Sequence, residues 1–124
     1  MPGFIVNYRR FRPIVEGLRE CGYDVLEDVW NPTDEQLADC DGYLVCMYLA
    51  MKRPVETLRL KSRLREHNIP LIGWNRDAPW NTGARVWRMW WFRTLRVLDI
   101  YTAHSMQGAN RFARENFYLP NAAW

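Results

Sequence analysis

The chain has 124 residues, 48% of them hydrophobic and 25% charged, which is typical of one soluble globular domain. The formal net charge of +3 is too small to predict nucleic-acid binding. No apolar run reaches the roughly 18 residues of a membrane-spanning helix, and the N-terminal segment becomes charged too early for a signal peptide. Three cysteines without CxxC spacing indicate reduced thiols and give no zinc motif. We therefore expect a cytoplasmic protein without a metal site.

Strand-like and helix-like segments alternate in the first half of the chain. Apolar residues recur at helical spacing before Gly22, a residue type that often ends helices. Acidic residues follow Asn31 and Thr33, either of which suits the cap of a second helix. This half predicts strands at 3–8, 23–30 and 43–50 and helices at 11–22 and 31–42.

The second half continues the same alternation. Pro54 stands where the first turn of a helix accepts proline. The pattern then predicts helices at 53–68, 82–98 and 106–117, strands at 69–75 and 99–105, and a short strand or linker at 118–124. Strands that alternate with helices indicate a parallel sheet covered on both faces. We therefore predict one α/β domain over residues 1–124, a Rossmann-like three-layer αβα sandwich whose mostly parallel sheet has about six strands.

Polar residues follow several of the predicted strands. Ligands of open parallel sheets bind outside the carboxyl ends of the strands. Asn75, Arg76 and Asp77 fall just past one such end, and His104 falls past another. We therefore expect this edge of the sheet to be the binding site.

The first strand–helix turn contains Arg9 and Arg10 but no glycine. A dinucleotide site needs GxGxxG at this turn, and the chain also lacks a P-loop and a GxSxG motif, so we expect no bound cofactor. The two arginines can hold a phosphate or carboxylate through their side chains, or they are solvated surface charge.

Each polar candidate also has a structural interpretation. Asp77 can act as a base toward an acceptor hydroxyl, or it can cap the turn and pair with Arg76. Asn75 can hydrogen-bond a ligand or its own loop. His104 can donate to a phosphate or a sugar hydroxyl, or it is a local cap.

Segment 82–98 is rich in tryptophan and arginine. Trp87, Trp90 and Trp91 share one broad helical face. This face can cover the sheet, lie at the inner surface of a membrane with arginines toward anionic lipid, or contact a partner domain. The sequence leaves these three alternatives open, and with them a location at the inner face of the membrane.

Three stretches resemble the N-terminal half of GT-B glycosyltransferases, closest to the CgeB-like group related to spore-coat maturation proteins. They are "IPLIGWNRDAPW", "LDIYTAHSMQGANRF" and "YLPNAAW", and "RPIVEGLRECGYDV" resembles the first helix and second strand of that group. The family turn reads Trp-Asp-Asp-Pro-like, whereas here Asn75 and Arg76 precede a single acid, Asp77.

The resemblance implies an acceptor-binding domain that works with a separate donor domain or subunit holding the nucleotide-sugar, without a metal ion. It implies that the 124-residue chain is a fragment or subunit that is inactive alone. Asp77 would then be catalytic, Asn75 and Arg76 would line the acceptor cleft, and Trp74 and Trp80 would wall it. The donor sugar, the acceptor and the oligomeric state are not specified.

A different class of function fits the same pattern of elements. Small doubly wound domains of the receiver or TIR type bind protein partners and catalyse no sugar transfer. A receiver would need acidic residues after its first strand, and "NYRR" has none. A non-catalytic interaction module therefore stays as the alternative.

Overall fold

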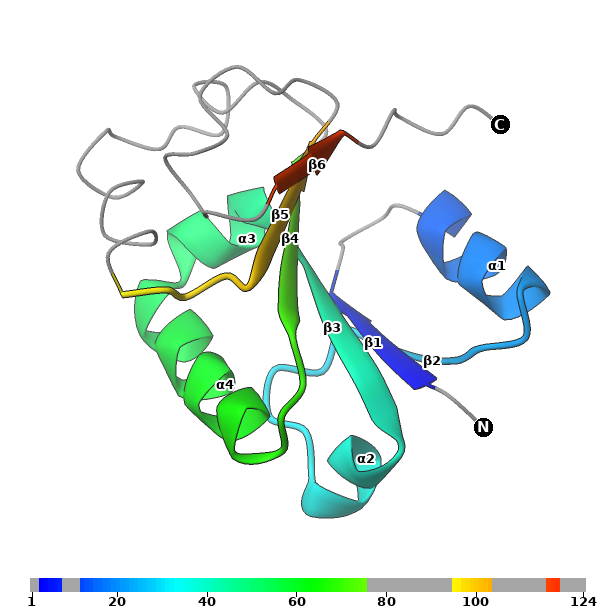
Figure 1. Cartoon of the computed structure of the whole chain (residues 1–124), viewed down its shortest axis with the longest axis horizontal. Coiled ribbons are helices and arrows are strands. Elements are labelled where there is room, and N and C mark those ends of the chain that lie inside the picture. The colour runs from blue at the N-terminus through cyan, green and yellow to red at the C-terminus, as the bar shows by residue number, and fades with distance from the viewer. Residues whose placement is uncertain (1–2, 8–11, 76–94, 104–115, 119–124) are drawn as a thin grey trace.

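The computed structural model describes residues 3–7, 12–75, 95–103 and 116–118. Strands and helices alternate along most of this part of the chain (Figure 1). In chain order they are β1 (Gly3–Asn7), α1 (Arg12–Glu20), β2 (Asp24–Glu27), α2 (Asp34–Ala38), β3 (Cys40–Cys46), α3 (Met47–Lys52), α4 (Pro54–Glu66), β4 (Leu71–Asn75), β5 (Ile100–Ala103) and β6 (Asn116–Tyr118).

The strands form a single sheet in the order β2-β1-β3-β4-β5-β6, and every neighbouring pair is parallel. In its register Ile5 of β1 lies beside Tyr43 of β3, and Val45 of β3 lies beside Gly73 of β4. The predicted α/β class and parallel sheet are therefore confirmed.

Helices lie on both faces of this sheet, with α1 on one side and α3 and α4 on the other (Figure 1). Because strand side chains alternate between faces, neighbouring residues of β1 enter different cores. Ile5 joins the larger core, which includes residues of α2, α3 and α4, whereas Val6 packs with Val15 of α1 and Trp74 of β4. This layering is compatible with a Rossmann-like fold.

Short-range signals account for the ends of several helices. Gly22 has φ 92°, and the amides of Gly22 and Tyr23 bond to the carbonyls of Arg19 and Leu18, closing α1 where the sequence predicted. At the start of α2, Thr33 Oγ1 accepts from the Gln36 amide at 3.2 Å. Gln36 Oε1 accepts in return from the Thr33 amide at 2.9 Å. Thr33, one of the two predicted caps, is therefore the cap of α2.

The strand predicted at 43–50 is wrong at both ends. The observed strand starts earlier, pairs with β1 and ends at Cys46, and the chain then continues as helix α3. Met47, Ala50 and Met51 are buried at the spacing of one helix face. A short, continuously apolar run fits a buried strand and a buried helix equally well, which is why the sequence pattern was ambiguous.

Further predicted boundaries differ from the structure, among them the end of the helix expected at 106–117, because Asn116 and Phe117 belong to strand β6. The strand expected at 23–30 ends at Glu27, because Asp28 adopts the left-handed φ of 57°. Most of the helix expected at 82–98, with its tryptophans, lies outside the described residues. Its last residues are not helical: a turn at Leu95 precedes the buried Leu98.

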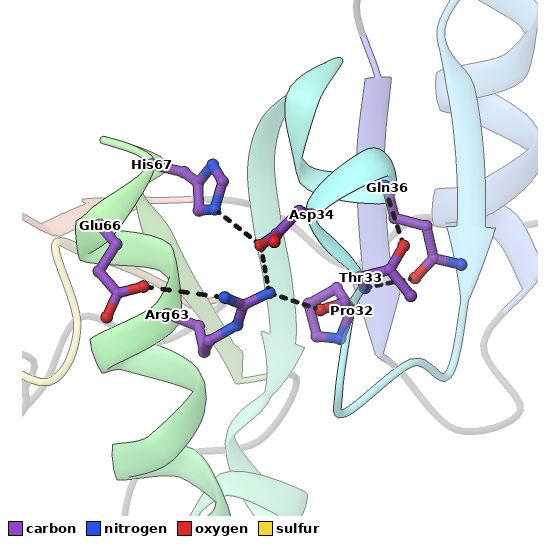
Figure 2. Close-up of polar contacts among 7 residues, drawn as sticks. All are labelled: Pro32, Thr33, Asp34, Gln36, Arg63, Glu66 and His67. Carbon is purple, nitrogen blue, oxygen red and sulfur yellow. Dashed lines mark hydrogen bonds and ion pairs between the residues drawn. The ribbon is translucent and has the colours of Figure 1, made fainter.

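Helix α2 is short and is tied to the end of α4 by ionic contacts (Figure 2). Arg63 of α4 contacts Asp34 at 2.8 Å and also donates to the carbonyl of Pro32 at 3.1 Å. His67 Nε2 lies 3.4 Å from the same Asp34 carboxylate. The hydrogen bond from Arg63 and its positive charge lower the pKa of Asp34 below its ordinary value.

Candidate functional site

The strand order has a topological switch point between β1 and β3, where the order in which strands are added to the sheet reverses. From β1 the chain moves outward to β2, and from β2 it returns past β1 to β3. The connections that leave the carboxyl ends of β1 and β3 therefore diverge, and doubly wound sheets bind their ligands at this position. We call the last residues of β1, β3 and β4 the carboxyl edge: Asn7, Cys46 and Asn75.

A buried polar pair lies beside this topological switch point, between β1 and β3. Asn7 is 2% exposed, and its Nδ2 donates to the Tyr43 hydroxyl at 3.1 Å. The hydroxyl in turn donates to the Val29 carbonyl at 2.6 Å. The pair thereby fixes the Asn7 amide and ties the chain that follows β2 onto the sheet.

The same pair limits the chemistry available at this position. Burial raises the pKa of Tyr43 above its ordinary value, although the hydrogen bond from Asn7 acts in the opposite direction. The phenol is therefore neutral at physiological pH and serves as a hydrogen-bonding group. Sequence reasoning missed this pair because its partners are 36 residues apart and share no local motif.

A second contact joins two segments that follow carboxyl ends of strands. The guanidinium carbon of Arg53, between α3 and α4, lies 5.6 Å from the ring centroid of Trp30, which follows β2. Arg53 also pairs with Glu56 at 3.1 Å. The contact holds the segment between β2 and α2 against the junction of α3 and α4. No sequence motif predicts it.

Trp74 and Asn75 are the predicted site residues that the structure describes. Asn75 ends β4 and pairs with Ala103 of β5, so its backbone lies at the predicted edge. Trp74 is 2% exposed and packs against Val6 and Val15. The expectation that Trp74 walls a sugar cleft is not supported, because its ring belongs to the core beneath α1.

The other predicted site residues lie outside the described part of the chain: Arg9, Arg10, Arg76, Asp77, Trp80 and His104. Their roles stay predictions. Within residues 3–7, 12–75, 95–103 and 116–118, no group of three His, Cys, Asp or Glu side chains is placed to hold a metal ion. No helix in these ranges is long and apolar enough to cross a bilayer.

Comparisons with known protein families, curated proteins and solved structures found no match.

Proposed function

We propose that the chain is the Rossmann-like acceptor-binding domain of a GT-B glycosyltransferase, which transfers a sugar from a nucleotide-sugar. The observation that supports this proposal best is the end of β4. This strand runs parallel to its neighbours and ends at Asn75, at the edge where open parallel sheets bind their ligands, and Arg76 and Asp77 are the next residues in the sequence.

The proposed roles follow from the chemistry of each side chain. Asp77 accepts the proton of the acceptor hydroxyl, and Asn75 and Arg76 hydrogen-bond the acceptor. Trp80 supplies an aromatic face for a sugar ring. Further positions around the edge are proposed to bind the anionic or hydroxyl groups of the ligand: Arg9, Arg10 and His104. Trp74 contributes to the core.

A donor domain or subunit is needed for the reaction, so the 124-residue chain alone is not expected to transfer sugar. Asp77→Asn in the enzyme assembled with its donor domain should lower turnover roughly tenfold or more, as loss of a general base does. The matched control is Asp41→Asn, at an exposed position near the start of β3. Equal turnover of the two variants would remove Asp77 from the chemistry.

One observation favours the non-catalytic alternative. The order of the first five strands, β2-β1-β3-β4-β5, is that of flavodoxin and of receiver-type domains, in which β2 alone lies on the outer side of β1. In the dinucleotide-binding order, both the second and the third strand lie on that side of the first strand. Phosphotransfer is still disfavoured, because β1 ends in the amide Asn7. Saturable binding of sugars favours the transferase, and a tight protein partner without sugar binding favours the interaction module.

A further inference from the structure

A hollow of about 800 Å³ lies at the opposite end of the sheet from the carboxyl edge. Its size is within the roughly 300–1,000 Å³ of small-molecule sites. It lies between the end of α4 and the segments that lead into β4 and β5. The polar and charged residues that line it are Lys61, Arg65, Asn68, Arg96 and Asp99.

The wall of the hollow contains an ion pair whose charges cancel. Lys61 is 6% exposed, and its Nζ lies 2.5 Å from Asp99 Oδ2. The same oxygen accepts the Leu71 amide at 2.7 Å. Because Asp99 is neutralised by Lys61 and also accepts this backbone hydrogen bond, its carboxylate does little to repel an anion.

Two further guanidinium groups line the hollow and give it a net positive charge. Arg65 and Arg96 are exposed, and neither forms an ion pair with another described residue. Arg96 has φ 51°, a left-handed conformation that residues other than glycine seldom adopt. Strained backbone of this kind is frequent at ligand-binding sites.

Backbone hydrogen bonds reduce the repulsion that the end of α4 exerts on an anion. Free carbonyls at the end of a helix would repel one. Here the Leu64 carbonyl accepts the amides of His67 and Ile69, and the Arg65 carbonyl accepts the amide of Asn68. The last turn is therefore capped by backbone bonds.

We propose that this hollow binds a small molecule through a phosphate group, held by Arg65 and Arg96. Guanidinium groups pair with phosphate oxygens through directed, charge-assisted hydrogen bonds. The site is independent of the proposed acceptor edge, because the two lie at opposite ends of the strands.

The test is a titration of the chain with inorganic pyrophosphate at constant ionic strength, followed through backbone amide NMR signals. We expect saturable shifts at Asn68 and Asp99 and none at Asn7. Arg65→Gln and Arg96→Asn should each weaken binding roughly tenfold, the usual effect of losing one charge-assisted hydrogen bond. Asparagine is chosen at 96 because it tolerates a left-handed backbone.

The matched control is Arg59→Gln, which removes the same charge from an exposed position of α4 that does not line the hollow. It should change the affinity less than twofold. An equal loss in the control would show general charge attraction and overturn the proposal. So would shifts that do not saturate, or shifts spread over the whole surface.

Discussion

Tyr43 joins Asn7 and the backbone of Val29 through one buried hydroxyl. Tyr43→Phe should lower the free energy of unfolding by about 1–3 kcal/mol, because it leaves the buried Asn7 amide and the part-buried Val29 carbonyl without this partner. Denaturant unfolding measures the change. The control is Tyr23→Phe, because Tyr23 is half-buried and its ring packs edge-on against Phe4 at 4.9 Å. Equal effects of the two variants would contradict the role given to the Tyr43 hydroxyl.

The raised pKa of Tyr43 also predicts a pH dependence. The unfolded phenol loses its proton near pH 10, whereas the folded one keeps it to higher pH. The folded state therefore binds more protons above pH 10, and its stability relative to the unfolded state falls as pH rises. Unfolding curves between pH 9 and about 11 should show a steeper loss in the wild type than in Tyr43→Phe. Identical slopes would show that this phenol titrates normally.

Asp34 should contribute to the dependence of stability on pH at the acid end of the range. Its pKa is lowered in the folded state by Arg63, so its contribution is present above the ordinary pKa of 3.8 and is lost as pH falls through the lowered value. Asp34→Asn should remove part of the acid destabilisation, and the effect should be small because the carboxylate is exposed to solvent. Thermal unfolding between pH 2 and about 6 tests this. An unchanged acid profile would mean that the contact in Figure 2 does not persist in solution.

At the level of elements, β4 packs closely because Gly73 has no side chain. A Cβ at this position would lie 2.6 Å from Met47 Sδ and 2.8 Å from Leu98 Cδ1. Gly73→Ala should lower the free energy of unfolding by about 1–3 kcal/mol through overpacking. Gly17→Ala is the control, because nothing lies within 4 Å of its Cβ and alanine favours the α1 helix. If Gly73→Ala unfolds with the same free energy as the wild type, α3 and the segment before β5 can move apart to admit the methyl group.

The sequence predicted those features of the elements that depend on nearby residues. Gly22, Thr33 and Pro54 set helix ends through contacts within a few positions. The roles of Gly22 and Pro54 were predicted correctly, and Thr33 was one of the two caps predicted for α2. The limits of β3 depend on pairing with β1, a long-range contact, and were predicted wrongly.

The same distinction applies to the candidate site. The edge of the sheet follows from the alternation of strands and helices, so the position of Asn75 could be predicted. The pairs Asn7–Tyr43 and Lys61–Asp99 join residues 36 and 38 positions apart, and only the fold brings them together. Trp74 was assigned to the cleft by the resemblance to GT-B enzymes, but strand alternation turns its ring into the core.

For the whole molecule, the parallel sheet separates two ends with different chemistry. The carboxyl edge carries the proposed acceptor site, and the opposite end carries the cationic hollow. A neutral sugar and pyrophosphate should therefore bind without competing.

The most direct measurement is an NMR titration of the chain with a panel of neutral oligosaccharides. An acceptor-binding domain should show saturable amide shifts at Asn7, Cys46 and Asn75, with Asn68 and Asp99 unchanged. If no sugar shifts the carboxyl edge while a protein partner binds tightly to the chain, the chain is an interaction module and the transferase proposal is wrong.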